Sequence, residues 1–176
     1  MKKKKVTKKK VGFPGTFDPI HLGQLDVILE AMNPKYNFEV VLIPLQIFNE
    51  SAKQSTMFSL EERINMLKEV IKSKKLEEKV SIKTLPTERG NLKSSIRQFL
   101  KNEGISMIIR GKREDNHDEE LRTKEKLEKE FGIRVLFMKT SEHKNISSTL
   151  IKEMMEENKD IKKLVPPEII KMIFRK

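Results

Sequence analysis

The sequence predicts an α/β fold in which a parallel five-stranded sheet carries helices on both faces. Short runs that are apolar almost throughout, such as Phe38–Pro44 and Ile105–Gly111, indicate strands buried on both sides, which is typical of parallel sheets. Segments with apolar residues at helical spacing lie between these runs, so strands and helices alternate along the chain. A length of 176 residues is sufficient for one domain with its own core.

In the first half of the chain, local patterns predict each element. Leu22–Met32 has apolar residues at helical spacing. Ser59 and Glu62 have the S-x-x-E spacing of a capping box, which satisfies free N–H groups at a helix start. Residues 79–85 alternate with a period of two, as in a strand. This half comprises strands at 10–13, 38–44 and 79–85, helices at 22–32 and 58–71, and a polar loop at 47–57.

The second half continues the alternation. Gly104 follows the predicted helix at Leu92–Asn102 as its C-terminal stop. The helix at His117–Phe131 is highly charged. This half comprises strands at 105–111 and 133–138 and helices at 92–102, 117–131, 149–157 and 167–174. With five strands and intervening helices, the expected architecture is a single Rossmann-like domain.

Charge separates a short tail from this domain. Residues 1–10 hold seven lysines, so the net charge of +11 falls to +4 (11 − 7) over residues 11–176. Because like charges repel, we expect a disordered, solvated tail. Non-specific contact of this tail with RNA or anionic lipid is the alternative, and no other nucleic-acid partner is expected.

Composition excludes several classes of protein. The chain has no cysteine, which excludes disulfides and thiolate zinc sites. It has no run of the ~18 apolar residues that a membrane span needs, and no secretory signal follows the tail. We therefore expect a cytoplasmic protein without a membrane partner.

The segment from Gly12 to Gln24 indicates a site. It is predicted to be a strand end, a glycine turn and a helix start. Gly15 lets the backbone approach a ligand closely, and Pro19 suits the first position of a helix. Free N–H groups at that helix start attract anions. His21 and Gln24, three residues apart, are expected to share one face of the helix.

Further segments with polar residues follow predicted strands. Ligands bind at the carboxyl ends of parallel strands, where the turn at 12–15, the loop after Pro44, the turn at 110–113 and the loop before Ile146 are expected to converge. A basic turn follows the strand at 105–111, with Arg110, Lys112 and Arg113 around Gly111. These cations can bind a phosphate group together, or they can form an ordinary basic turn on the surface.

The segment 145–149 precedes a helix, so its hydroxyls and N–H groups can hold a triphosphate. Ser147 or Ser148 can also simply cap the helix, and both roles are compatible. Lys53 can reach an acceptor phosphate or remain solvated. Acidic residues at 118–120 suit a helix start by charge alone. His117 and His143 lack companion ligands and are expected at the surface.

The motifs resemble those of a known family. Residues 14–23, P-G-T-F-D-P-I-H-L-G, resemble the signature of the nucleotidyltransferase superfamily, H/T-x-G-H, except that Gln24 replaces the second histidine. From about residue 11 to the C-terminus, the chain resembles bacterial phosphopantetheine adenylyltransferases in order and spacing. The matching segments are residues 14–20, 25–28, 57–63, 109–113, 146–153 and 165–169.

This resemblance implies transfer of AMP from ATP to 4′-phosphopantetheine, giving dephospho-coenzyme A and pyrophosphate in coenzyme A biosynthesis. Mg²⁺ is expected to arrive with ATP, without protein side chains as ligands. The acceptor phosphate attacks in line, so catalysis consists of positioning and charge stabilisation. The resemblance also implies a homo-oligomer, with a hexamer as the expected form.

The resemblance assigns roles to individual residues. The catalytic residues implied are His21, Gln24 and Arg113. The ATP-binding residues implied are Thr16, Phe17, Gln24, Gly111, Lys112, Arg113, Glu119, Ile146, Ser147, Ser148 and Thr149. The acceptor-binding residues implied are Thr16, Lys53, Gln54, Ile96 and Arg110.

Departures from the family pattern leave alternatives open. Gln24 carries no charge, and the loss of one charge-stabilising donor typically costs about 10²–10³ in rate. Gln54 stands where the family has its acceptor-binding lysine, with Lys53 one residue away. His21 stands where the family usually has threonine, and we hypothesise that it supplies the missing cation.

Two other functions remain possible from the sequence. The chain also resembles nicotinate mononucleotide adenylyltransferase in three segments, which are residues 21–23, 146–149 and 161–166. The two glutamines are alternatively the mark of a catalytically impaired, nucleotide-binding homologue.

Overall fold

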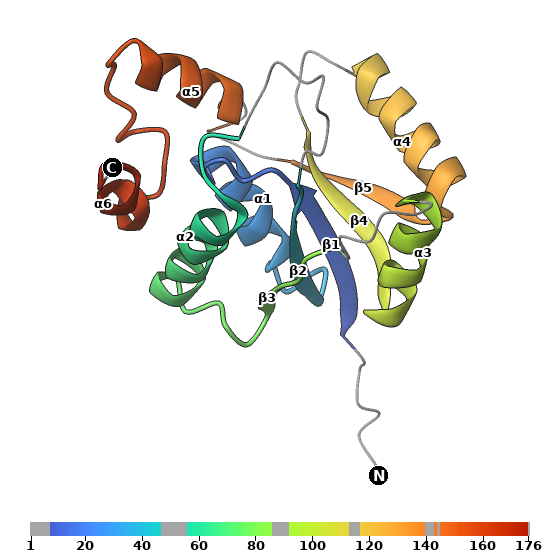
Figure 1. Cartoon of the computed structure of the whole chain (residues 1–176). Coiled ribbons are helices and arrows are strands. Elements are labelled where there is room, and N and C mark those ends of the chain that lie inside the picture. Colours follow the sequence, from blue (N-terminus) through green and yellow to red (C-terminus); the bar gives the residue numbers. More distant parts are fainter. Residues whose placement is uncertain are drawn as a thin grey trace.

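The central element is a parallel five-stranded sheet. A computed structural model describes residues 8–46, 56–85, 92–112, 117–139, 143 and 145–175. Every strand pairing in the sheet is parallel, and the strand order is β3-β2-β1-β4-β5 (Figure 1). The strands are β1 (Lys9–Gly15), β2 (Phe38–Pro44), β3 (Val80–Ile82), β4 (Ile105–Lys112) and β5 (Arg134–Lys139). The α/β fold predicted from the sequence is confirmed.

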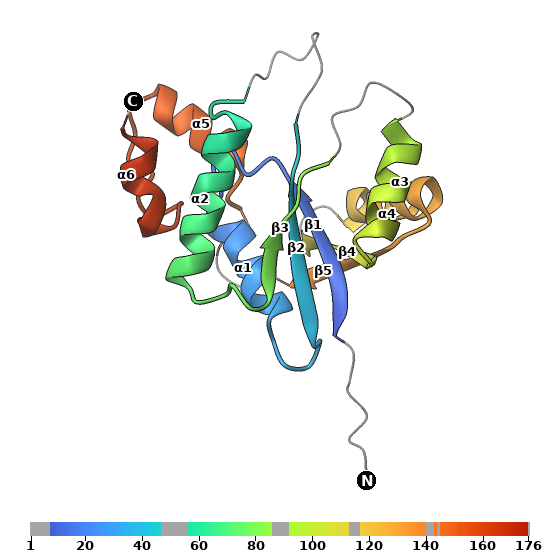
Figure 2. The ribbon, with the colours of Figure 1, turned by 60° about the horizontal axis from the view of Figure 1, so that its bottom comes forward.

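Helices cover both faces of the sheet. Figure 2 shows α1, α2, α5 and α6 on one side and α3 and α4 on the other. The helices are α1 (Leu22–Ala31), α2 (Leu60–Ser73), α3 (Leu92–Asn102), α4 (His117–Phe131), α5 (Ser148–Glu156) and α6 (Ile170–Ile173), and a 3-10 turn, η1 (Pro167–Ile169), precedes α6. In the described part of the chain, no helix is both long and apolar enough to cross a membrane.

The sheet divides the interior into two apolar cores. Successive residues of a strand point to opposite faces. Accordingly, Val40 and Leu42 of β2 belong to the core beneath α1, α2 and α5, whereas Val41 and Ile43 belong to the core beneath α3 and α4. All four side chains are buried, which explains why β2 is apolar almost throughout. Burial on both faces thus produced the pattern from which the parallel sheet was predicted.

The strand order creates the place for a site. From the central strand β1, the chain continues to β2 and β3 on one side and then crosses to β4 and β5 on the other. Such a reversal of winding opens a crevice at the carboxyl ends of the strands on either side of it. Here those strands are β1 and β4, which end at Gly15 and Lys112.

Several boundaries differ from the sequence predictions. β1 begins at Lys9, so the last two lysines of the predicted tail belong to the sheet, and residues 1–7 lie outside the described residues. β3 is confined to Val80–Ile82, shorter than the alternation at 79–85 predicted. Helix α1 begins at Leu22 and not at Pro19, which lies in a turn after a cis peptide bond. The polar loop predicted at 47–57 lies mostly outside the described residues.

Other local predictions are confirmed. Ser59 and Glu62 form the expected capping box of α2: the Ser59 hydroxyl accepts from the Glu62 N–H at 3.2 Å, and the Glu62 carboxylate accepts from the Ser59 N–H at 2.8 Å. Gly104 follows α3 with φ +68°, a left-handed conformation that ends helices and favours glycine. These elements depend on neighbours within a few residues, so their sequence patterns are sufficient to predict them.

Candidate active site

A cavity of about 370 Å³ lies where the carboxyl ends of β1 and β4 meet the N-termini of α1 and α5. Its wall combines residues 13–16 of the β1 turn, residues 110–112 of β4 and residues 146–149 at the start of α5. Three of the four segments expected to converge therefore do so. The fourth, the loop after Pro44, lies largely outside the described residues.

Most predicted site residues whose side chains are described line this cavity. They are Thr16, His21, Gln24, Arg110, Gly111, Lys112, Ile146, Ser147, Ser148 and Thr149. Lys53, Gln54 and Arg113 lie outside the described residues, as does the side chain of Glu119.

Two predicted site residues do not line the cavity. Phe17 is fully buried with φ +47°, and its ring packs edge-to-face on Phe13 with centroids 5.5 Å apart. Its aromatic side chain thus contributes to the core around the turn. Ile96 lies on α3 and packs against the core on that side of the sheet.

His21 and Gln24 cap the start of α1 reciprocally. The Nδ1 atom of His21 accepts from the N–H of Gln24, and Oε1 of Gln24 accepts from the N–H of His21, both at 3.3 Å. His21 is the N-cap, with extended backbone, and Gln24 is the third helical residue. The two side chains thus lie together at the cavity as expected, but His21 is the N-cap and not a residue of the helix itself.

This capping bears on the hypothesis that His21 supplies a cation. An imidazole nitrogen that accepts a hydrogen bond carries no proton, so a doubly protonated ring could not accept this bond at Nδ1. His21 is only 6% exposed and lines the cavity. The cationic role hypothesised for His21 stays a prediction, and it would require the ring to give up this capping bond.

The same cap orients the Gln24 side chain. Because Oε1 faces the His21 N–H, the amide nitrogen Nε2 forms the other end of the group. A Cβ placed on Gly15 would lie 3.4 Å from this Nε2, so the Gln24 amide nitrogen lies over the glycine of the β1 turn. Gln24 therefore places a hydrogen-bond donor at the cavity between β1 and α1.

Gly23 lies where the main chain of α1 comes very close to the main chain of the segment before α5. A Cβ on Gly23 would lie 2.6 Å from the carbonyl oxygen of His143, a contact that real Cβ atoms essentially never make. Gly23 therefore lets the segment before α5 rest directly on α1. This contact joins two walls of the cavity.

His143 was predicted at the surface, and the structure corrects this. Its ring is partly buried, lines the cavity and pairs through Nδ1 with Oδ2 of Asp26 at 2.8 Å. Asp26 lies on α1, 117 residues earlier in the chain. No local spacing could reveal a pair so far apart in sequence.

Glu120 is a second wall residue that the sequence analysis missed. Among the acidic residues at 118–120, the family resemblance implied a binding role only for the neighbouring Glu119. Glu120 lies on α4, is 9% exposed and lines the cavity together with Thr123, three residues further along. Helical spacing predicts such a shared face, but the sequence does not say which face of a highly charged helix points inward.

The wall suits a ligand that is anionic at one end. Arg110 and Lys112 contribute positive side chains, and the N-termini of α1 and α5 contribute free N–H groups and the positive ends of helix dipoles. Ser147 caps α5, because its hydroxyl accepts from the Leu150 N–H at 3.1 Å, and it lines the cavity as well. Ser147 is thus the cap that the sequence predicted, and its place in the cavity wall is compatible with the second role foreseen, that of holding a triphosphate.

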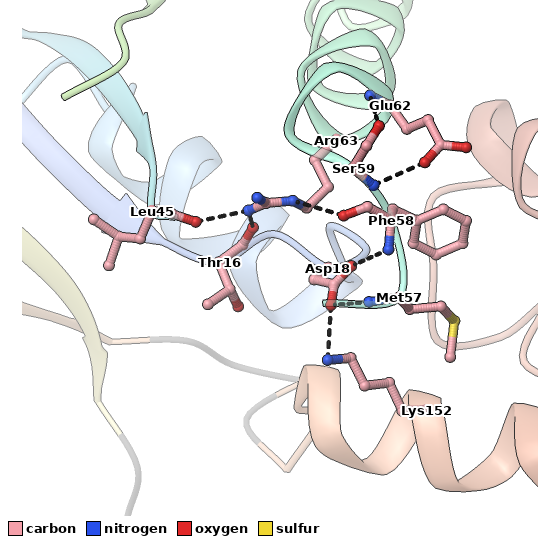
Figure 3. A network of polar contacts seen from close by, with 9 residues as sticks. All are labelled: Thr16, Asp18, Leu45, Met57, Phe58, Ser59, Glu62, Arg63 and Lys152. Atoms are coloured by element: carbon pink, nitrogen blue, oxygen red, sulfur yellow. Dashed lines mark hydrogen bonds and ion pairs between the residues drawn. The ribbon is translucent and has the colours of Figure 1, made fainter. Parts of the chain in front are cut away.

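A buried guanidinium supports the β1 turn. Arg63 of α2 is 2% exposed, and it donates to the carbonyl oxygens of Thr16 at 2.5 Å, Leu45 at 2.8 Å and Phe58 at 3.2 Å (Figure 3). Burial lowers the pKa of Arg63, and the neighbouring Asp18 carboxylate opposes that shift. Arg63 therefore holds the ends of β1 and β2 and the start of α2 together.

Protein side chains do not gather into a metal centre in the part of the chain that the structure describes. No group of three or more His, Asp or Glu side chains is placed there to hold an ion.

A doubly wound parallel sheet with an anion-suited cavity at its switch point is an arrangement in which many α/β proteins bind nucleotides. The profile of the cytidylyltransferase-like family matches residues 12–154, and the chain belongs to this class of nucleotidyltransferases. Within the class it is a member of the phosphopantetheine adenylyltransferase family. The relative from Thermotoga neapolitana is 30% identical over 167 residues, covering 93% of this chain and 94% of the relative. The relative from Lachnoclostridium phytofermentans is 32% identical over 172 residues, covering 95% of each.

A solved structure shares the fold. Plasmodium falciparum nicotinic acid mononucleotide adenylyltransferase, complexed with NaAD, has a TM-score of 0.64 and covers 96% of this chain and 97% of its own. Its sequence identity is 19%, so this similarity concerns the fold alone.

Proposed function

We propose that this protein transfers the adenylyl group of ATP to 4′-phosphopantetheine, releasing pyrophosphate and forming dephospho-coenzyme A. The observation that carries the proposal is the meeting of three segments at one cavity: residues 13–16, 110–112 and 146–149. Each of these segments resembles the phosphopantetheine adenylyltransferase family, and the relatives of that name match over nearly the whole chain.

The chemistry needs no covalent enzyme intermediate. An oxygen of the acceptor phosphate forms a bond to the α-phosphorus of ATP, while the bond from that phosphorus to the bridging oxygen breaks. The bonding electron pair leaves with pyrophosphate. The protein has to align the two phosphates and stabilise the charge that develops on the transferring group.

Each wall of the cavity has a part in this scheme. The N-terminus of α5, with Ser148 and Thr149, receives the β- and γ-phosphates. Arg110 pairs with the acceptor phosphate, and Lys112 neutralises charge on ATP. Glu120 accepts hydrogen bonds from the adenosine. Mg²⁺ enters bound to the ATP phosphates and thus as part of the substrate.

Gln24 acts on the transferring phosphate. Its amide nitrogen donates a hydrogen bond to an oxygen on which negative charge develops, where the superfamily signature has a histidine. Because the amide is neutral, we expect a slower reaction than with a charged donor in the same place. In this proposal, Arg113 also binds the phosphates of ATP, and Lys53 and Gln54 bind the phosphate of the acceptor.

The decisive experiment measures pyrophosphate release by purified protein with ATP and Mg²⁺. The reaction is run with 4′-phosphopantetheine, with nicotinate mononucleotide and without an acceptor. We expect release with 4′-phosphopantetheine alone, together with formation of dephospho-coenzyme A. Release with the mononucleotide alone would assign the protein to the alternative acceptor. Binding of ATP without release in any reaction would indicate a homologue that no longer reacts.

A further inference from the structure

The segment at the start of α5 is held to the β1–α1 turn by one ion pair. The Nζ atom of Lys152 lies 2.7 Å from Oδ2 of Asp18 (Figure 3). Asp18 is fully buried, and the Lys152 side chain is 23% exposed. Lys152 is not among the residues that line the cavity. Its charge is thus paired with a carboxylate of the scaffold.

Asp18 is a junction between three parts of the chain. Its Oδ2 also accepts from the N–H of Met57 at 2.8 Å, and its Oδ1 accepts from the N–H of Phe58 at 2.9 Å. The carboxylate thus joins the β1–α1 turn to the segment before α2 and, through Lys152, to α5. Arg63 contacts the first two of these parts through the carbonyls of Thr16 and Phe58, but makes no contact with α5 among its three hydrogen bonds.

Helix α5 also packs on the core through apolar side chains, with Met154 and Met155 partly buried against it. In this helix, which lies wholly within the described residues, Ile151 is the one buried residue. These apolar contacts hold α5 against the core, but hydrophobic contacts are not directional. The adjacent Lys152 supplies a second, directional contact next to Ile151. The ion pair is thus a polar, directional contact between α5 and the β1–α1 turn, beside the apolar packing.

The geometry points to Lys152 as a positioning residue: we propose that its pair with Asp18 sets the α5 N-terminus at the distance from the β1 turn that binds the ATP triphosphate. This inference rests on the proposed function, because it assigns the triphosphate to that helix start. Ser147, the N-cap, and Lys152 are five residues apart, about 7.5 Å along a helix, so a small rotation about the ion pair displaces the cap.

The carboxylate does not need Lys152 merely to be hydrogen-bonded. Without Lys152, Asp18 retains the N–H groups of Met57 and Phe58 as donors. Loss of Lys152 should therefore leave the turn folded while it releases α5. A buried ion pair is in general weak evidence for stability, and a role in defining one geometry is its better-attested use.

The test compares three variants of the full chain by calorimetric titration with a non-hydrolysable ATP analogue in Mg²⁺, without acceptor. Lys152→Met removes the charge and keeps the stem. Lys152→Arg keeps the charge. Lys159→Met is the matched control, because Lys159 forms an exposed ion pair with Glu157 just beyond the same helix. Melting temperatures are measured for all of them.

We expect Lys152→Met to raise the Kd for the analogue by about tenfold to a hundredfold, the size of effect that misplacement of a binding group by about 1 Å can cause. Lys152→Arg should restore most of the affinity, and Lys159→Met should leave it within twofold. In turnover with 4′-phosphopantetheine, the KM for ATP should rise and the KM for the acceptor should not.

Other outcomes would overturn the inference. An unchanged Kd in Lys152→Met would show that the pair does not position the triphosphate site. A Lys152→Met protein that does not fold would make the pair a determinant of folding. Binding of the analogue by the unaltered protein without any turnover would refute the proposed transfer but leave the positioning role intact. No binding by the unaltered protein would refute both.

Discussion

The side chain of Gln24 and the side chain of His21 each bind the other residue's main chain, at 3.3 Å, where α1 begins beside the cavity. The pair has two consequences. It uses Nδ1 of His21 as a hydrogen-bond acceptor, and it turns the amide nitrogen of Gln24 toward the glycine of the β1 turn. The departure from the superfamily signature is thus built into the helix start itself. Substitutions that preserve the cap can separate its structural role from a chemical one.

Gln24→Glu should retain the fold and lose activity. A glutamate at this position still accepts from the His21 N–H and suits the positive end of α1, so the capping box survives. It has no donor for the transferring phosphate and adds a negative charge. We expect an unchanged melting temperature and a fall in kcat of about 10²–10³. Steady-state kinetics and thermal unfolding measure the two effects; a retained kcat would remove Gln24 from the chemistry.

His21→Asn tests whether the histidine is needed as a cation. Asparagine is among the best N-cap residues, and its side-chain oxygen can accept from the Gln24 N–H. Because the cap needs only an acceptor at this position, we expect His21→Asn to retain kcat within a fewfold if capping is the role of His21. His21→Ala should lower the free energy of unfolding by about 0.5–2 kcal/mol through loss of the cap. A large loss of kcat in a stable Asn variant would instead support a cationic His21.

Arg63→Met should destabilise the whole domain. It leaves the carbonyl oxygens of Thr16, Leu45 and Phe58 without this donor and removes a buried charge near Asp18. Removal of one partner from such a buried group costs about 3–5 kcal/mol. Urea unfolding measures the loss. Arg122→Met, at an exposed position of α4, is the control and should change little; equal effects of the two would contradict the assignment.

Gly23→Ala should separate α1 from the segment before α5. The added methyl group would lie 2.6 Å from the His143 carbonyl oxygen, so one of the two segments must move. We expect a loss of about 1–3 kcal/mol in stability, as for other overpacked sites, and weaker ATP binding. Leu29→Ala, on an exposed face of the same helix, provides the comparison. A Gly23→Ala protein with normal stability and affinity would show that this contact yields easily.

Glu168 should contribute to stability in a pH-dependent manner. Burial tends to raise its pKa, but hydrogen bonds from Lys74, the main chain and Ser73 outweigh burial and hold the pKa below the ordinary 4.5. The Lys74 Nζ and Ser73 Oγ atoms lie 2.7 and 2.8 Å from Oε1. A lowered pKa in the folded state means that the stabilisation is present above pH 4.5 and is lost as the pH falls through the folded value.

The variant Glu168→Gln should therefore be less stable than the parent protein at neutral pH and should converge with it at low pH. Urea unfolding at a series of pH values gives both curves. Glu157→Gln serves as the control, because Glu157 is 58% exposed. If the free energies of unfolding of the parent protein and Glu168→Gln differed by the same amount at all pH values, ionisation of Glu168 would not be the source of the stabilisation.

Local sequence patterns predicted much of this fold because local interactions form it. The capping box of Ser59 and Glu62 acts over three residues, and the helix His117–Phe131 has the bounds that its sequence predicted. The run at Phe38–Pro44 is apolar almost throughout because both faces of this strand are buried. In the same way, strand ends with glycine, basic or hydroxyl residues predicted which segments would meet at the cavity.

By itself, then, the sequence determined the alternation of strands and helices, the two-sided sheet and the three segments that line the cavity. Tertiary structure alone decided that His143 pairs with Asp26, that Glu120 points into the cavity, and that Lys152 reaches Asp18. The physical reason is distance along the chain. Spacing encodes contacts between near neighbours, whereas these contacts join residues that come together only when the sheet is wound and α5 is packed on it.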